Sequence, residues 1–260
     1  MARWPRTLAS ERPISGEAQV TERLFKGAQP ALDVVDLETW YGASQALFGV
    51  SFTIMPGEVV GLVGRNGAGK TTVLRSVMGL LQRQSGRVAI GGVDTTKLGP
   101  AARARLGVGY CPEERAVFAS LTVAENLALP PSVGPEGLSE AEILTLFPNL
   151  ESRRHQYGGQ LSGGEQQMLA IARILRTGAR TLMFDEPTEG LAPVIVKQIE
   201  AALITLKRRG FTILLVEQNL AFVLRVADRI VAIEHGRVVA ERIVDEPLEV
   251  ERHLAQYLVL

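Results

Sequence analysis

A glycine-rich segment at residues 64–71 carries the most specific chemical pattern in the sequence. It reads Gly64-Arg65-Asn66-Gly67-Ala68-Gly69-Lys70-Thr71 and matches the form G-x-x-x-x-G-K-[ST]. Glycines in such a loop let backbone N–H groups converge on phosphate oxygens, and a helix that begins there adds positive potential. We expect Lys70 to reach the β- and γ-phosphates of a nucleotide, and the Thr71 hydroxyl to hold Mg²⁺. An ordinary glycine-rich turn is the alternative, but the strand-like run before the segment favours the phosphate site.

An acidic pair follows a second apolar run. Asp185-Glu186 comes directly after Thr181–Phe184, and open α/β sheets bind ligands at the carboxyl ends of their parallel strands. Asp185 is then expected to bind Mg²⁺ or its waters, and Glu186 to polarise the water that attacks the γ-phosphate. Taken alone, the pair would only mark the end of a strand. Beside a phosphate-binding loop it predicts a catalytic site.

A third segment has the pattern of a helix start. Ser162 and Glu165 have the spacing of a capping box, and Gly163 and Gly164 between them leave the backbone N–H groups free of side chains. The segment is either a well-capped helix or a second anion site. Because it lies far along the chain from Lys70, one nucleotide need not satisfy both sites within a single copy.

The elements that must position these residues follow from hydrophobic periodicity. Strand-like runs occur at Leu32–Leu37, Ala46–Ile54, Val59–Val63, Arg87–Ile90, Thr181–Phe184 and Thr212–Val216. Helices are expected at Thr72–Leu80 and Pro193–Arg209, and a hairpin at His235-Gly236 between Ile230–Ile233 and Arg237–Ala240. This order of strands and helices predicts an α/β fold with a mainly parallel sheet.

Composition and charge narrow the class of protein. The 260 residues contain 28 basic and 28 acidic side chains, so there is no general electrostatic case for nucleic acid. The single cysteine, Cys111, fits a reducing compartment and is expected to be a small buried residue. We expect residues 1–30 to form a mobile extension, and the start of the chain to lack a secretion signal, which predicts a cytoplasmic location.

Together these motifs resemble those of the ATP-binding-cassette (ABC) ATPases. The matching parts are Gly64–Thr71, Leu161–Gln166 and Leu182–Glu186, in that order. The resemblance implies a domain at 31–260 with a P-loop NTPase core, an N-terminal antiparallel β part and a smaller helical subdomain at about 113–177. It implies ATP and Mg²⁺ as cofactors, bound through residues 64–72 including Thr72. It also implies a head-to-tail dimer in which Ser162, Gly163, Gly164 and Glu165 of one copy face the nucleotide of the other.

Other positions extend the resemblance, and some depart from it. Tyr41 occupies the position of the aromatic that stacks on adenine, although it could be only a turn anchor. Glu113 stands where the family usually has a glutamine that touches Mg²⁺ or the attacking water, and Gln218 replaces the usual histidine. Gln218 can donate to the γ-phosphate but cannot titrate. It could instead close its strand by bonding nearby backbone. His155, His235 and His253 are expected to be surface or packing residues.

These departures together resemble the ATPase subunits of importers for branched-chain amino acids and related hydrophobic or amide substrates. The implied partners are a second ATPase subunit, identical or paralogous, and transmembrane permease subunits at the cytoplasmic face of the membrane. An exporter subunit would carry the same nucleotide chemistry. A cassette ATPase acting on nucleic acid or ribosomes is disfavoured by the neutral charge and by the single copy of each motif.

Overall fold

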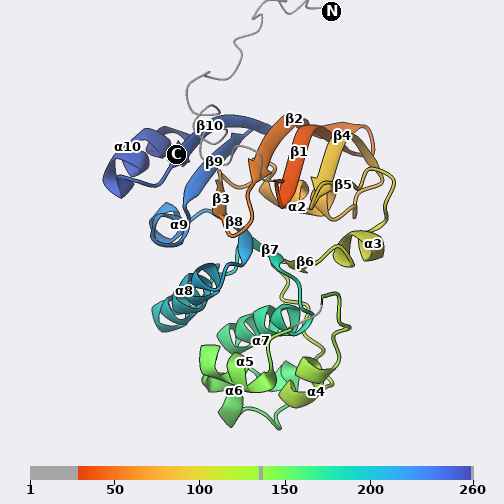
Figure 1. Ribbon diagram of the computed structural model, residues 1–260. Helices are drawn as coiled ribbons and strands as arrows, with labels where there is room; N and C mark the ends of the chain where they lie inside the picture. Colours follow the sequence, from red (N-terminus) through yellow and green to blue (C-terminus); the bar gives the residue numbers. More distant parts are fainter. Residues whose placement is uncertain (1–28, 135–136, 259–260) are drawn as a thin grey trace, which may run out of the picture.

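The structure is a computed structural model that describes residues 29–134 and 137–258. The predicted N-terminal extension therefore lies almost entirely outside the described residues. A mainly parallel sheet forms the centre of the molecule, with strand order β10-β9-β3-β8-β7-β6 (Figure 1). Its strands are β3 (Val59–Val63), β6 (Val108–Cys111), β7 (Thr181–Asp185), β8 (Thr212–Glu217), β9 (Arg229–Glu234) and β10 (Arg237–Ile243). Only the β9–β10 pair is antiparallel among them.

A second sheet is antiparallel and has the order β2-β1-β4-β5. Its strands are β1 (Leu32–Tyr41), β2 (Ser44–Ile54), β4 (Arg83–Ile90) and β5 (Val93–Asp94). The predicted Leu32–Leu37 strand was too short, because β1 shifts register near Asp36, where φ is 47°. That irregularity breaks the alternation of side chains by which a strand is identified in a sequence.

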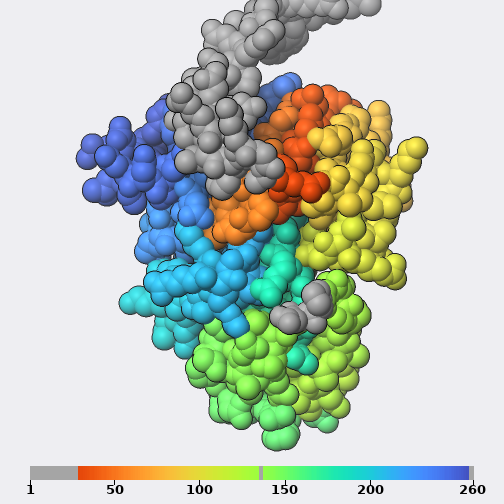
Figure 2. All heavy atoms as spheres, in the orientation of Figure 1, coloured from red at the N-terminus to blue at the C-terminus, as the bar shows by residue number. Residues whose placement is uncertain are grey.

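The helices cover the parallel sheet and build a separate part of the molecule. They are α2 (Lys70–Val77), α3 (Pro100–Ala104), α4 (Val123–Ala128), α5 (Glu140–Leu146), α6 (Asn149–Ser152), the 3₁₀ turn η1 (Gly158–Gln160), α7 (Gly163–Arg176), α8 (Pro193–Arg208), α9 (Leu220–Val226) and α10 (Pro247–Leu258). Helices α4, α5 and α6 pack against α7 at one end of the molecule, where the atoms of this part form a projecting lobe (Figure 2). None of the helices within the described residues is long and apolar enough to cross a membrane.

The parallel sheet is buried on both faces, as its continuous apolar runs predict. In β3, Val59 and Val63 face a core shared with α7 to α10, whereas Val60 and Leu62 face a core shared with α2 and the antiparallel sheet. Strand β8 alternates in the same way. The strand β6 was not predicted. It is only four residues long, and it contains Gly109, where a Cβ would come within 2.2 Å of Ile174 in α7.

Helix α2 ends earlier than predicted, at Val77 rather than Leu80. Gly79 adopts φ 70° just beyond it, and this left-handed conformation ends helices. The buried Arg103 guanidinium of α3 donates to the backbone carbonyls of Ser76 and Val77 at 2.9 and 2.7 Å. These bonds satisfy acceptors that the helix end leaves open and hold α2 in place.

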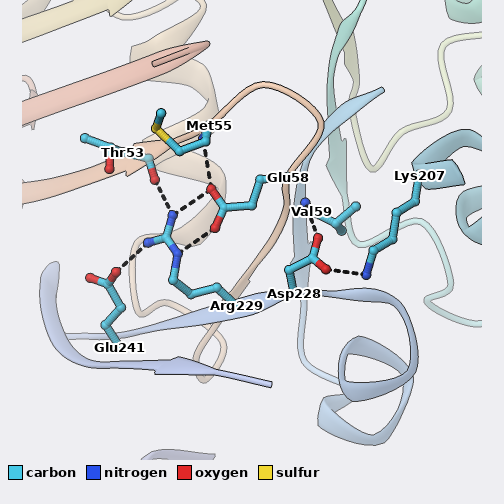
Figure 3. A network of polar contacts seen from close by, with 8 residues as sticks. All are labelled: Thr53, Met55, Glu58, Val59, Lys207, Asp228, Arg229 and Glu241. Carbon is cyan, nitrogen blue, oxygen red and sulfur yellow. Dashed lines mark hydrogen bonds and ion pairs between the residues drawn. The ribbon is translucent and has the colours of Figure 1, made fainter. Parts of the chain in front are cut away.

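A buried ion-pair network joins the two sheets (Figure 3). Arg229 in β9 is 3 % exposed and pairs with Glu58, the residue before β3, and with Glu241 in β10. Its guanidinium also donates to the carbonyl of Thr53 in β2. Glu58 in turn accepts a bond from the backbone N–H of Met55 at 2.8 Å. The network fixes the entry of the chain into β3, at the end opposite the glycine-rich segment.

We predict that Arg229→Met lowers the free energy of unfolding by about 3 to 5 kcal/mol, because it leaves buried carboxylates without a partner. Urea unfolding followed by circular dichroism measures this change. The matched control is Arg225→Met, whose arginine is about half exposed in its pair with Glu200, and it should cost less than about 1 kcal/mol. Equal stability of the two variants would contradict the assigned role of the network.

Candidate functional site

The glycine-rich segment forms the predicted strand–loop–helix unit between β3 and α2. Gly64 has no room for a side chain, because a Cβ there would lie 2.3 Å from the carbonyl oxygen of Ile233. Gly69 adopts φ 109°, a conformation that side chains rarely allow, and caps the start of α2. Helix α2 then begins at Lys70, so its unpaired N–H groups open onto the loop. This part of the prediction is confirmed.

Lys70 is 4 % exposed and is held on several sides. Its ammonium donates to the backbone carbonyls of Gly64 and Arg65, at 2.9 and 3.1 Å. It also lies 3.1 Å from Oε1 of Glu186, the residue that follows β7. The carboxylate of Glu186 therefore contacts the ammonium that we expect to bind phosphate.

Asp185 is buried at the end of β7, 1 % exposed. It accepts hydrogen bonds from Thr71 Oγ1 at 3.0 Å and from the Tyr110 hydroxyl at 3.1 Å. Burial raises the pKa of its carboxyl, although the bonds from Thr71 and Tyr110 act to lower it. Thr71 and Asp185, which the sequence places far apart, thus meet through a direct bond.

Glu186 has the conformation of a strained turn residue, with φ 46°. Its backbone N–H donates to the carbonyl of Val216 in β8 at 2.9 Å. Its Oε2 accepts a 2.7 Å hydrogen bond from the side-chain amide of Gln218. Gln218 therefore reaches a carboxylate rather than nearby backbone, which was the alternative considered from the sequence.

These residues border a cavity of about 910 Å³. Of the predicted positions, its wall contains Asn66, Gly67, Gly69, Lys70, Thr71, Thr72, Glu113 and Glu186. It also contains residues that the sequence did not single out as site residues: Gln45, Ala46, Phe48, Glu189, His235 and Gly236. The β9–β10 hairpin comes close because Gly236 N–H donates to the carbonyl of Ala68 at 2.8 Å. The local sequence contains no pattern that predicts this contact.

The remaining predicted residues lie beside the cavity or away from it. Tyr41 ends β1, is 46 % exposed, and its hydroxyl lies 3.5 Å from Thr72 Oγ1. Ala68 and Gly64 form the buried base of the loop, whereas Arg65 is exposed. Cys111 is buried as expected, and burial raises the pKa of its thiol to about 12, so the group is a neutral packing residue.

Ser162, Gly163, Gly164 and Glu165 lie away from the cavity, at the start of α7. The predicted capping box is present: Glu165 N–H donates to Ser162 Oγ at 3.3 Å, and Ser162 N–H to Glu165 Oε2 at 2.8 Å. Ser162 is exposed. Gly164 is a packing position as well, because a Cβ there would come within 2.8 Å of Ile195 in α8.

The donor set beside Lys70 fits a magnesium ion that is shared with a nucleotide. Thr71 and Asp185 offer oxygen atoms, the ligands that Mg²⁺ prefers, and Glu113 adds another carboxylate at the cavity wall. Within the described residues, no group of three or more His, Cys, Asp or Glu side chains could hold a metal ion without other ligands. Magnesium commonly takes few protein ligands and completes its shell with phosphates and water.

Comparison with known proteins agrees with this geometry. The sequence profile of the family described as "ABC transporter" matches residues 47–189, which is more than half of the chain. The chain belongs to the ABC transporter family. It is an ATPase subunit of an ABC transporter, and such subunits couple the hydrolysis of ATP to transport.

The relatives whose names specify a transported substrate include two that are named for branched-chain amino acids. The high-affinity branched-chain amino acid transport ATP-binding protein BraG of Pseudomonas aeruginosa is 42 % identical over 206 residues, covering 78 % of this chain and 88 % of BraG. The probable branched-chain amino acid transport ATP-binding protein LivF of Archaeoglobus fulgidus is 38 % identical, covering 85 % and 95 %. A solved ABC transporter cassette in its ADP conformation superposes with a TM-score of 0.74 at 26 % identity, covering 88 % and 96 %.

The ion pair between Lys70 and Glu186 generates a prediction about ATP affinity. Bound phosphates must displace the Glu186 carboxylate from Lys70. Glu186→Gln removes that competing charge, so we expect the variant to bind ATP roughly three- to tenfold more tightly, about 1 kcal/mol. Isothermal titration calorimetry of the full-length chain measures the change.

The matched control is Glu114→Gln, which removes one charge from an exposed residue that pairs with Arg75. Its ATP affinity should stay within about twofold of the parent value, since an exposed pair contributes little. An affinity of Glu186→Gln equal to that of Glu114→Gln would show that the pair does not compete with phosphate.

Proposed function

We propose that this chain energises an importer for branched-chain amino acids or related hydrophobic or amide substrates. The similarity to BraG and LivF carries this proposal. Glu113 and Gln218 support it, because this pair of departures resembles the same branch of the family. An exporter subunit has the same nucleotide chemistry, so the direction of transport needs a direct test.

We propose the following roles at the nucleotide site. The backbone N–H groups of residues 64–71 and the Lys70 ammonium bind the β- and γ-phosphates, and Tyr41 stacks on adenine. Thr71, Asp185 and Glu113 would hold Mg²⁺. When bound, this ion neutralises charge that develops on the phosphates. The support is that Thr71 and Asp185 bond directly, and that Glu113, Lys70 and Thr71 border one cavity.

Glu186 is proposed as the general base. Once the phosphates have displaced it from Lys70, its carboxylate is free to accept a proton from the attacking water. Gln218 has no accessible pKa and serves as a neutral donor. Its 2.7 Å bond to Glu186 supports this role, because it places the amide beside the base.

The second anion site is proposed to act on a second ATPase subunit. Ser162 is exposed and is the N-cap residue of α7, but it does not border the cavity of its own chain. A head-to-tail dimer would bring the N-terminus of α7 to the nucleotide of the partner, where the helix dipole favours an anion. The partner is an identical or paralogous subunit.

The lobe that contains α4 to α7 is the proposed contact with the membrane subunits. Permease subunits would bind the lobe that contains α4 to α7 and hold the ATPase at the cytoplasmic face of the membrane. The equal numbers of basic and acidic side chains support a protein partner rather than nucleic acid.

Glu186→Gln should lower single-turnover ATP hydrolysis by at least about 100-fold, because the amide cannot accept the proton of the attacking water. The reaction is followed by release of phosphate from ATP in the full-length chain. Glu114→Gln is again the control and should keep the parent rate. Hydrolysis by Glu186→Gln at the parent rate would exclude Glu186 as the base.

Ser162→Arg should abolish ATP-dependent dimer formation while monomeric ATP binding stays within about threefold. The new cation removes the cap and fills the space intended for the partner's phosphate. Light scattering of the Glu186→Gln background with ATP measures the dimer, and calorimetry measures binding. Ser139→Arg, which alters the capping box of the peripheral helix α5, is the control and should still dimerise. Loss of ATP binding by the Ser162→Arg monomer would contradict the arrangement.

The transport assignment is tested by uptake of radiolabelled leucine, isoleucine and valine into cells that carry this chain together with the subunits that co-purify with it. We expect uptake that needs ATP hydrolysis and disappears in Glu186→Gln. Uptake that is unaffected by this substitution, or ATP-driven efflux in place of uptake, would overturn the proposal of an importer.

A further inference from the structure

Glu217 is a buried carboxylate next to the catalytic region, and the mechanism above does not use it. It is the last residue of β8 and is 3 % exposed. Its Oε1 accepts a hydrogen bond from the backbone N–H of Thr188 at 3.0 Å and another from Thr188 Oγ1 at 2.6 Å. The backbone N–H of Asn219 also acts to lower the pKa of this carboxyl. Glu217 therefore connects the end of β8 to the loop that follows β7.

That loop carries Glu186 two residues before Thr188. The backbone conformation of Glu186 has φ 46°, which costs energy and persists only where the surroundings hold it. Its N–H is bonded to Val216, and its side chain to Gln218. Val216 and Gln218 thus hold Glu186, and Glu217 holds Thr188, which lies two residues further along the same loop.

The ionised carboxylate of Glu217 does not stabilise the folded state. Burial raises the pKa of its carboxyl, although the bonds from Thr188 and Asn219 act to lower it. A carboxyl with a raised pKa stabilises the fold below its ordinary pKa, and this contribution is lost as the pH rises through the raised value. At neutral pH the ionised form is therefore a net cost to stability, and a stabilising role alone does not account for this residue.

We propose that Glu217 is a positioning residue for ATP hydrolysis. Through Thr188 it fixes the loop behind Glu186 and so holds the Glu186 carboxylate in register with Gln218. This inference rests on the proposed role of Glu186 as general base. It concerns the rate of the chemical step, because Glu217 bonds Thr188 and is not among the residues that line the cavity.

The chemistry of the bonds explains why a carboxylate is present. Thr188 presents an N–H and a hydroxyl, and both groups donate to the same oxygen, Oε1 of Glu217. A glutamine at position 217 keeps one acceptor oxygen but loses the negative charge, so its bonds to the two donors are weaker. Glu217→Gln therefore keeps the shape of the side chain and loses part of the clamp.

The test uses the full-length chain with Thr188→Val, Thr188→Ser and Glu217→Gln. Valine keeps the size and the backbone N–H of residue 188 but removes the hydroxyl, whereas serine keeps the hydroxyl. We expect Thr188→Val and Glu217→Gln each to lower kcat by about 10- to 100-fold with KM for ATP within about threefold, the pattern of an interaction that matters only in the transition state. Thr188→Ser should keep kcat within about threefold of the parent.

Two further variants separate positioning from stability. The double variant Thr188→Val/Glu217→Gln should be no slower than the slower single variant, because both changes break one unit. Glu58→Gln is the control: Glu58 is also a buried carboxylate, but it lies at the opposite end of β3 in the Arg229 network (Figure 3). It should lower the Tm and leave kcat unchanged.

Several outcomes would overturn the inference. These are kcat within about twofold of the parent in both Thr188→Val and Glu217→Gln, a rise of KM with unchanged kcat, or a loss of kcat that Thr188→Ser shares. If Glu217→Gln does not fold, Thr188→Val alone decides. Glu186→Gln is measured in parallel: if it is inactive while the other variants are normal, only the present inference fails, whereas an active Glu186→Gln overturns the proposed base itself.

Discussion

The parallel pairing of β3, β8 and β7 is the constraint on which the site depends. Val63 of β3 pairs with Glu217 of β8, and Val216 of β8 pairs with Asp185 of β7, so three chain segments leave the sheet side by side. The glycine-rich segment, the acidic pair and Gln218 follow these strands directly. Because parallel strands end at the same edge, burial of their apolar side chains also brings Lys70, Asp185 and Glu186 together.

Carboxylates outnumber cationic groups among the side chains near Lys70 at this edge. Asp185, Glu186, Glu189 and Glu217 lie close together, and the pKa of Asp185 and of Glu217 is raised chiefly by burial. The pKa of Glu189 is also raised, first by its side-chain interaction with Glu186. Lys70 offsets part of this negative charge through its ion pair with Glu186. A site of this kind is poised to change when an anionic ligand competes for the same lysine.

Two buried arginines outside the site hold the helix and the strand on either side of the glycine-rich segment. Arg103 fixes the end of α2, and the Arg229 network fixes the start of β3. Both guanidinium groups are buried and donate to carbonyls or carboxylates, so they hold backbone segments with little freedom. The loop that carries Glu186 is anchored to the end of β8 by the bonds of Glu186 with Val216 and Gln218, although its own backbone is strained.

The sequence by itself determined the features that arise within one short stretch of chain. The loop and helix start of the glycine-rich segment, the acidic pair at the end of β7 and the capping box of Ser162 and Glu165 are local patterns, and each of these local conformations is present where it was predicted. Only the tertiary structure decided which distant residues meet. His235 and Phe48 reach the cavity through a hairpin contact, Gln218 bonds Glu186, and Glu217 bonds Thr188. These contacts depend on strand order and register, which side-chain periodicity along one segment does not encode.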